Sequence, residues 1–432
     1  MRELERRFPD VLAVVGVHSG KYIAERETPR IREASLRLGV AHPVVNDRQF
    51  RVWRGFAVRA WPTIVVIDAR GYVVGQHAGE FTADALAPAI ERLVADAERG
   101  GLLVREPLPH QVESPAVAPG ALRYPGKVAV DGGRLAIADS GHHRLLVGVL
   151  EAGGRRLRVT HVVGAGEPGL VDGPLAAARL TMPQGLVFDG DRLYVADAGN
   201  HAVRAVELGP PGDGTVRTVA GTGARLRTAA DRRAGAMASP WDLVLHAGTL
   251  HVAMAGTHQL WALDPASGRA RVHAGQGGED IADDLLERAL LAQPMGIAVL
   301  GDRLVFADAE TSAIRWADVD RGGRVGTWVG TGLFDFGDAD GVGDAVRLEH
   351  AQHVAVHPRS GRLLVVDSYN DALKWLDPAT RRVESWVRGL HEPAGAAVGD
   401  GVVYVADTNA HRIAIIDEAT GEIGELEVEG ER

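Results

Sequence analysis

The stretch PQGLVFDGDRLYVADAGNHAV at 183–203 decides the fold, because the chain carries six copies of it. Two short apolar runs flank a tight Asp-Gly turn, and a third apolar run follows the polar string ADAGNH. Short apolar runs bounded by Gly and Asp indicate antiparallel strands. The other copies begin at Pro125, Pro240, Pro294, Ala351 and Pro393. Each copy therefore predicts three strands joined by short turns.

A further apolar segment follows each copy and supplies a fourth strand. These segments lie at 158–163, 216–220, 270–273, 325–329, 382–387 and 422–428. Four antiparallel strands per repeat, six times over, predict a six-bladed β-propeller across 125–432. A single blade cannot bury both of its faces, so the core should lie between neighbouring blades. A solenoid is the weaker alternative, since solenoid repeats of this length are helical and these are not.

Three strings of the repeat resemble the NHL repeat: ADSGHH at 138–143, ADAGNH at 196–201 and ADTNAH at 406–411. The inter-blade strings at 163–180 and 329–348 share a VG-G…DG…A-RL pattern. Together they resemble bacterial and animal proteins that carry a thioredoxin-like domain before an NHL propeller. The resemblance implies a mainly-β protein: a six-bladed NHL-type propeller after a small, incomplete thioredoxin-like α/β domain. It also implies an interaction role, since NHL propellers are mostly interaction modules.

The region 1–98 alternates between strand-like and helix-like patterns and reads as a separate α/β domain. The expected elements are a first helix at Arg2–Phe8, a strand buried on both faces at 11–17, a helix at 26–39, a hairpin of 63–68 with 72–75, and a helix at 83–98. Prolines then break every periodicity across 99–124, which we interpret as a semi-extended linker before the propeller at 125–432.

By the resemblance, Trp61-Pro62-Thr63 corresponds to the cis-proline segment of the thioredoxin fold, and Pro62 is a structural relic or a residue that contacts peptides. The Cys-x-x-Cys segment of that family is missing, and the chain contains no cysteine. Thiol–disulfide exchange is therefore impossible for this sequence. The strand expected between 11–17 and 63–68 is missing as well. We interpret the domain as a truncated reading of a longer gene, whose upstream part would restore the strand and possibly the thiols.

Composition narrows the remaining classes of function. The net charge is −10, which argues against a nucleic-acid partner. The sequence holds no apolar run long enough to span a membrane and no secretion signal at its start, so we expect no membrane partner and a cytoplasmic location. Without cysteine there is no disulfide and no thiolate zinc site.

The innermost strands carry a second pattern, two residues after the first residue of each copy. Glycine occupies this position in the even copies, and a titratable residue occupies it in the odd copies. The glycines are Gly185, Gly296 and Gly395, and the titratable residues are Lys127, Asp242 and His353. Three further candidates lie one residue earlier: Gln184, Trp241 and Gln352. These side chains should line the channel mouth, either as a site for a polar ligand or as a salt-bridge network that plugs the channel.

The recurring aspartates have a structural interpretation, because residues repeated around a ring do not converge on one point. They are Asp139, Asp197, Asp308, Asp367 and Asp407, with Met254 in the third copy. We expect them to bond to turn backbone, and we give the same interpretation to His143, His201 and His411. The acidic inter-blade loops hold Asp172, Glu279, Asp280, Asp338 and Asp340. Even FGDADGVGD at 336–344 is an incomplete Ca²⁺ loop, so we expect no metal and no cofactor.

The sequence therefore favours a non-catalytic binding platform for a protein or a small polar ligand. Motifs for a nucleophile elbow or a phosphate-binding loop are missing, and we assign no catalytic residue. Two alternatives remain open. One is a thiol–disulfide oxidoreductase whose cysteines lie upstream of this start. The other is a propeller hydrolase or lyase of the lactonase type that uses a channel metal.

Overall fold

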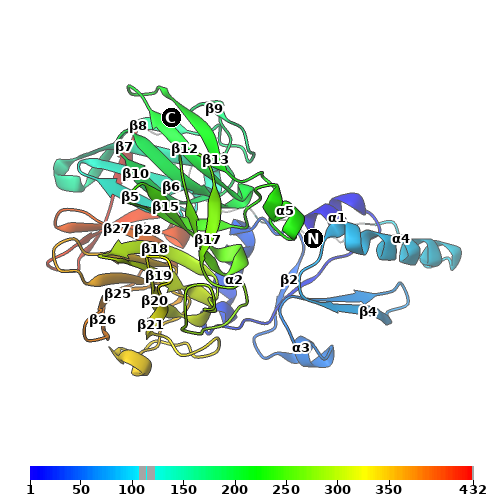
Figure 1. Ribbon diagram of the computed structural model, residues 1–432. Helices are drawn as coiled ribbons and strands as arrows, with labels where there is room; N and C mark the ends of the chain where they lie inside the picture. Colours follow the sequence, from blue (N-terminus) through cyan, green and yellow to red (C-terminus); the bar gives the residue numbers. More distant parts are fainter. Residues whose placement is uncertain (107–112, 114–121, 431–432) are drawn as a thin grey trace. The chain divides into compact units, whose positions relative to one another are not determined.

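The computed structural model describes residues 1–106, 113 and 122–430, and it divides into two compact units at Ala116–Val117. In the second unit, the described residues form six sheets of four or five strands (Figure 1). Within each sheet, four successive strands of the chain lie side by side and antiparallel, as the repeats predict. Each sheet is one blade.

Blades 1 to 3 are built from the first three copies of the repeat. Blade 1 contains β5 (Val128–Asp131), β6 (Arg134–Asp139), β7 (Arg144–Glu151) and β8 (Arg156–Val163). Blade 2 contains β10 (Pro183–Asp189), β11 (Arg192–Asp197), β12 (Ala202–Leu208) and β13 (Gly214–Ala220), with β9 (Gly173–Pro174) at its outer edge. Blade 3 contains β14 (Pro240–His246), β15 (Thr249–Met254), β16 (Gln259–Leu263) and β17 (Ala270–Ala274), and the helix α5 (Ala229–Arg233) precedes it.

Blades 4 to 6 follow the same plan. Blade 4 contains β18 (Pro294–Leu300), β19 (Arg303–Asp308), β20 (Ala313–Asp318) and β21 (Val325–Val329). Blade 5 contains β23 (His353–Val356), β24 (Leu363–Asp367), β25 (Ala372–Asp377) and β26 (Arg382–Arg388), with β22 (Gly341–Val342) at its outer edge. Blade 6 contains β27 (Pro393–Val398), β28 (Val402–Asp407), β29 (Arg412–Asp417) and β30 (Ile423–Glu425).

The innermost strands close a ring. β5 contacts β10, and the contacts continue through β14, β18, β23 and β27 back to β5. Six apolar clusters fill the spaces between blades, and each draws its residues from two neighbours. Val252 of blade 3 packs with Tyr194 of blade 2, for example. The core therefore lies between blades, as expected for a propeller.

One predicted strand is wrong in its extent. The apolar pattern predicts a single fourth strand of blade 6 at 422–428. In the structure β30 ends at Glu425, and β31 (Glu427–Glu429) leaves the blade and pairs in parallel with β8 of blade 1. The break falls at Leu426, which is buried between blades 6 and 1 and whose N–H donates to Ile413 O at 2.9 Å. Burial of this side chain turns the chain toward blade 1.

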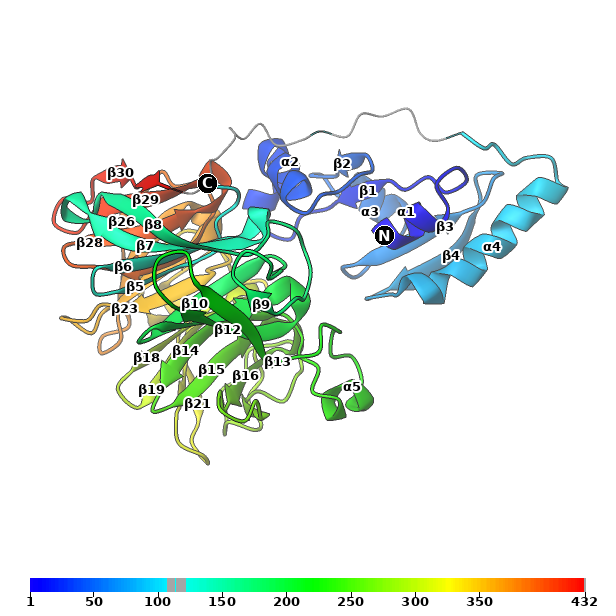
Figure 2. The same cartoon turned by 90° about the horizontal axis from the view of Figure 1, so that it is seen from above.

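The first unit contains two small sheets. β1 (Gly16–His18) pairs in parallel with β2 (Val44–Asn46), and β3 (Thr63–Ile67) pairs antiparallel with β4 (Val73–Ala78) (Figure 2). The helices are α1 (Arg2–Arg7), α2 (Thr28–Arg37), α3 (Arg51–Gly55) and α4 (Ala83–Arg99), with a short 3₁₀ helix at Ala24–Arg26. The predicted hairpin and three predicted helices are present. The sequence missed β2 and α3, which are only 3 and 5 residues long.

The strand predicted at 11–17 is wrong. β1 begins only at Gly16, and the side chains of Val15 and Val17 are 53% and 43% exposed. A strand is buried on both faces only where a wide sheet and its helices cover it. Among the described residues β1 pairs only with β2, and no sheet joins β1 to β3. The Trp61–Pro62 peptide bond is cis, as the resemblance implied. Most of the predicted linker at 99–124 lies outside the described residues.

Candidate functional site

Lys127, Asp242 and His353 meet inside the propeller. The Nζ atom of Lys127 lies 3.0 Å from Asp242 Oδ2 and 2.9 Å from His353 Nδ1. Asp242 Oδ2 and His353 Nδ1 are 3.1 Å apart. All three residues are buried. The structure thus brings together the three titratable residues that the alternating pattern singled out, and we call them the channel triad.

Glycine in the even blades makes room for the channel triad. A Cβ atom on Gly185 would collide with the Asp242 carboxylate. On Gly296 it would lie 2.6 Å from His353 Cα, and on Gly395 it would lie 2.9 Å from Lys127 Cγ. The innermost strands converge so closely that a side chain fits at only every second position. This crowding explains the alternation seen in the sequence.

The hydrogen bonds of His353 define where its proton lies. Nε2 is 3.0 Å from Ala396 O, and a carbonyl oxygen only accepts, so Nε2 carries the proton. In the neutral ring, Nδ1 is then an acceptor and takes a hydrogen bond from Lys127 Nζ. Burial lowers the pKa of His353, and Lys127 lowers it further, so the ring is neutral. The imidazole therefore accepts from the lysine rather than sharing charge with it.

Asp242 and Lys127 form a buried ion pair. Burial by itself raises the pKa of Asp242, but the charge of Lys127 holds it below its usual range. Burial lowers the pKa of Lys127, and Asp242 opposes that shift. Asp242 also accepts from the N–H groups of Leu243 and Ile297, at 2.9 and 3.1 Å. The carboxylate is therefore bonded on both oxygens.

The ammonium group of Lys127 is surrounded by more hydrogen-bond acceptors than it has hydrogens to donate. Besides the triad, its Nζ atom donates to the carbonyls of Met295 and Gln352, at 2.7 and 3.2 Å. An ammonium group has three hydrogens, and four acceptors surround this one. The channel triad thus uses its polar atoms within the fold and resembles the predicted plug. That it also binds a ligand stays a prediction.

The three neighbouring candidates do not bond to the channel triad through their side chains. Gln184 is buried, and its Nε2 lies 3.4 Å from Ser140 Oγ. Gln352 contributes its backbone carbonyl to Lys127. Trp241 is half-buried and packs on a small apolar cluster that contains Met295. Its Nε1 has no hydrogen-bond partner among the described residues.

A set of hydrogen bonds between blades was not predicted from the sequence. In each blade a 3₁₀ turn of three residues follows the second strand, and the residue after this turn has a positive φ. The side chain of that residue accepts from a backbone N–H at the start of the next blade, at 2.9–3.2 Å. The acceptors are His143, His201, His258, Ser312, Asp371 and His411. The donors are the N–H groups of Met182, Ser239, Gln293, His350, Glu392 and Tyr124, in the same order. We call these six hydrogen bonds the blade clasp. The recurring histidines carried the signal for it.

The recurring aspartates are structural, as expected, but each accepts from a backbone N–H that lies 16 or 18 residues earlier in the chain, not from its own turn. Three of them also hold a buried cation. Each cation lies on the third strand of its blade, with a side chain that is 0% exposed, and bridges to an acid of the preceding inter-blade loop. The sets are Asp197–Arg204–Asp172, Asp308–Arg315–Asp283 and Asp367–Lys374–Asp338. Burial raises the pKa of the three recurring aspartates, and the cations oppose it. Blade 3 has Met254 and Trp261 at these two positions.

The acidic loops likewise bind protein groups. Asp172 accepts from Thr218 as well as Arg204, and Asp340 accepts from the N–H and Oγ of Ser385 at 2.8 and 2.9 Å. Across the part of the chain that the structure describes, no three His, Asp or Glu side chains gather as a metal site would require. The three aspartates of the loop at 336–344 thus bond to protein donors.

A family model for the NHL repeat matches residues 122–147, 180–205 and 390–416. The chain contains NHL repeats. The matched NHL repeats correspond to blades 1, 2 and 6, which keep both the recurring aspartate and the recurring histidine. The family model does not mark blades 3 to 5, which the strand order places in the same ring.

Two curated relatives match nearly the whole chain. "Protein SUPPRESSOR OF QUENCHING 1, chloroplastic" of Arabidopsis thaliana is 35% identical, over 98% of this chain and 43% of its own length. "NHL repeat-containing protein 2" of Bos taurus is 33% identical, over 95% of this chain and 62% of its own length. This NHL-repeat chain thus spans less than two thirds of either relative. A chain from a nidogen/laminin complex matches 69% of this chain and 92% of its own, at 15% identity and a TM-score of 0.46.

Proposed function

We propose that this NHL-repeat protein is a non-catalytic binding platform for a protein partner or a small polar ligand. The observation that supports it is the saturated channel triad. Asp242 and His353 both accept from Lys127, and Lys127 and His353 also donate to backbone carbonyls, so the three side chains are poorly placed for acid–base chemistry on a substrate. A ring closed by such internal bonds is a rigid support for binding loops.

We place the binding face at the channel mouth, above the triad. Trp241 supports this choice, because its indole N–H is a donor without an acceptor among the described residues. A buried polar group without a partner is costly, and a rotation of the indole that let a ligand oxygen accept from this N–H would remove that cost. Gln352 is half-buried beside the triad, and its side chain makes no bond to it.

A photo-cross-linking experiment tests the platform. Benzoylphenylalanine replaces Gln352 at the channel mouth, or Asp400 in the fully exposed turn between β27 and β28 as the control. We expect a discrete adduct from position 352 in the host cell and none from position 400. Equal labelling at both positions, or none at either, would contradict a binding face at the channel mouth.

A second candidate concerns the first unit, which we propose is thioredoxin-like and redox-inactive in this sequence. The cis bond before Pro62 supports it, together with the parallel β1–β2 pair. Trp61 Nε1 donates to Ser19 O at 2.8 Å, which ties the cis segment to the end of β1. In an insulin-reduction assay, we expect no activity from this chain. Activity from it would overturn the proposal, since it has no thiol.

The compartment is a proposal as well. Among the described residues, no helix is both long and apolar enough to cross a membrane. We propose a cytoplasmic location, whereas the name of the Arabidopsis thaliana relative points to the chloroplast for that protein. Fractionation of the native host, followed by immunoblotting, distinguishes cytoplasm from other compartments.

A further inference from the structure

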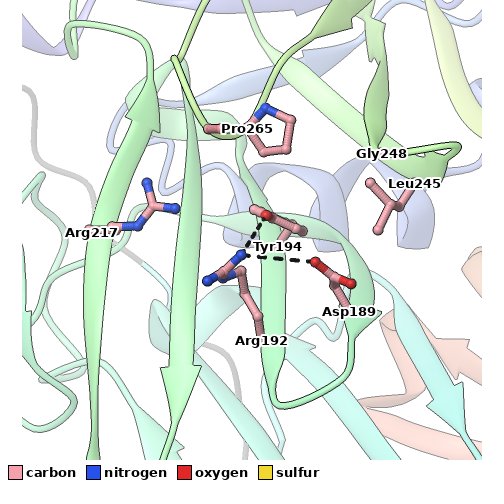
Figure 3. A pocket seen from close by; sticks show the side chains of 8 residues that line it. Asp189, Arg192, Tyr194, Arg217, Leu245, Gly248 and Pro265 are labelled. Atoms are coloured by element: carbon pink, nitrogen blue, oxygen red, sulfur yellow. Dashed lines mark hydrogen bonds and ion pairs between the residues drawn. The ribbon is translucent and has the colours of Figure 1, made fainter.

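A pocket of about 430 Å³ lies between blades 2 and 3, away from the channel triad (Figure 3). In blade 2 its lining comes from the end of β10, from β11 and from β13. In blade 3 it comes from β14 and the turn after it, and from the turn between β16 and β17. The lining residues are Asp189, Arg192, Tyr194, Arg217, Leu245, Gly248, Pro265 and Ala266. Small-molecule sites have volumes in this range.

The molecule itself shows how the equivalent position in another pair of blades is filled. Tyr404 on β28 of blade 6 corresponds to Tyr194 on β11 of blade 2, since each lies three residues before the recurring aspartate. The Tyr404 hydroxyl donates to Gly154 O at 2.9 Å, in the turn between β7 and β8 of the next blade. A Cβ atom on Gly154 would collide with that hydroxyl. The β7–β8 turn of blade 1 therefore packs directly against the Tyr404 hydroxyl.

The corresponding turn of blade 3 leaves Tyr194 without such an acceptor. β16 and β17 have 5 residues each, whereas β7 and β8 have 8 each. The Tyr194 hydroxyl accepts from Arg192 Nη1 at 3.2 Å, and its own O–H has no acceptor among the described residues. Figure 3 shows this hydroxyl in the pocket, with Arg192 bridging it to Asp189. The pocket thus contains a donor that the fold does not use.

The pocket beside Tyr194 also differs in charge from the equivalent position beside Tyr404. Strand pairing places Arg217 in the row of Tyr194, and Gly424 in the same row beside Tyr404. In blade 2 the Arg217 guanidinium therefore forms part of the pocket wall, whereas blade 6 has a glycine at the matching position. Glu207 Oε1 lies 2.5 Å from Arg192 Nε but 4.0 Å from Arg217 Nε. Arg192 holds the carboxylate, which leaves Arg217 at the limit of an ion pair and available to a ligand.

We propose that this pocket binds a carboxylate that carries a small apolar group. The Tyr194 O–H and the Arg217 guanidinium donate to the carboxylate oxygens, and Leu245 and Pro265 contact the apolar part. Charge-assisted bonds to a carboxylate are the strong class of hydrogen bond. The carboxylate can belong to a free small acid or to an acidic side chain of a peptide. The proposal rests on the proposed binding function but not on the channel mouth.

Isothermal titration calorimetry on the full chain tests the pocket, with 3-phenylpropionate as the probe and 3-phenylpropanamide as its uncharged counterpart. We expect Arg217→Gln and Tyr194→Phe to weaken the acid at least about tenfold, the loss of one charge-assisted hydrogen bond. Glu207→Gln should tighten it, because the change removes a negative charge 4.0 Å from Arg217 that repels the ligand carboxylate. Tyr404→Phe is the matched control and should leave the affinity unchanged. Melting temperatures show whether each variant is folded.

A second series separates the two sources of the carboxylate. It compares acetyl-Gly-Glu-Leu-Gly-amide with its Gln counterpart. Tighter binding of the Glu peptide than of 3-phenylpropionate assigns the site to acidic peptides, and the reverse assigns it to small acids. The proposal is overturned if neither probe binds at millimolar concentration, or if Glu207→Gln, which keeps Tyr194 and Arg217, fails to tighten binding. If position 352 still cross-links in that case, the proposed function stands without this pocket.

Discussion

The channel triad is where single residues matter most, because Lys127, Asp242 and His353 stabilise one another inside the ring. We expect Asp242→Ala combined with His353→Ala to lower the free energy of unfolding by about 3–5 kcal/mol, since Lys127 would then be buried without a counter-charge. Urea denaturation followed by tryptophan fluorescence measures this. Asp400→Ala is the control, because its ion pair with Arg359 is 3.9 Å long and exposed, and we expect no measurable change.

A double variant with a near-normal melting temperature would contradict a structural role. It would instead favour the ligand interpretation of the triad, since side chains kept for binding can be removed at little cost in stability. A single denaturation curve thus distinguishes the two interpretations drawn from the sequence, a structural plug and a ligand site.

Gly185 tests the explanation for the alternation along the innermost strands. A Cβ atom at this position would collide with the Asp242 carboxylate, so we expect Gly185→Ala to cost about 1–3 kcal/mol through overpacking. Gly133→Ala is the matched control, because nothing lies within 4 Å of its Cβ position. Thermal unfolding of both variants measures the difference. Equal melting temperatures would show that the channel relaxes around the added methyl group.

Among the elements, the blade clasp joins each 3₁₀ turn to the next blade, and four of its six acceptors are imidazoles. Nδ1 accepts a hydrogen bond only when it is unprotonated. Burial lowers the pKa of His143 and His201 below the usual value, and nearby arginines lower them further. A lowered folded pKa means that the unfolded chain binds protons first. The contribution of these histidines to the free energy of unfolding is therefore fully present above the usual pKa of 6.5, and it is lost as the pH falls toward the lowered pKa values.

We expect His143→Asn with His201→Asn to flatten this pH dependence. Asparagine tolerates a positive φ and offers an oxygen acceptor that does not titrate. Asp371 and Ser312 already serve as oxygen acceptors in the clasp. Urea denaturation between pH 8 and pH 5 measures the slope. Some slope should remain, because burial also lowers the pKa of His251, to about 3, and of His273. If the free energy of unfolding depends on pH as steeply in the variant as in the wild type, the clasp histidines do not cause the pH dependence.

The strands of the propeller could be predicted because the same pattern of apolar runs and turns occurs six times. The convergence of Lys127, Asp242 and His353 followed from one position compared across copies. The recurring histidines marked part of the clasp, but the full set could not be predicted, because its acceptors are His, Ser and Asp, which share a backbone conformation and a place rather than a side-chain type. The strand at 11–17 failed for another reason. Its apolar run indicates burial, but burial depends on neighbouring strands that a local pattern does not contain.

At the scale of the whole molecule, the ring closes between blades 6 and 1 without exchanging a strand inside a blade. Tyr404 donates to Gly154 O at 2.9 Å, and Thr408 Oγ1 donates to Pro125 O at 2.8 Å. The N–H of Tyr124 donates to His411 Nδ1 at 3.1 Å and completes the clasp. An apolar cluster that includes Leu426 fills the same seam. Local contacts thus close the ring, and β31 adds a covering strand to the outer edge of blade 1.

Removal of β31 measures how much this covering strand contributes to closure. We expect a chain that ends at Leu426 to fold but to unfold at lower urea, because β8 loses its parallel partner and becomes an exposed edge. Amide hydrogen exchange should speed up in β8 and leave β13 of blade 2 unchanged. Glu427→Ala with Glu429→Ala is the control, since it removes the ion pairs to Arg156 at 3.0 and 3.6 Å but keeps the strand. If this control matches the truncation, the ion pairs account for the effect. If β8 keeps its protection in the truncated chain, closure rests on the Tyr404, Thr408 and His411 contacts alone.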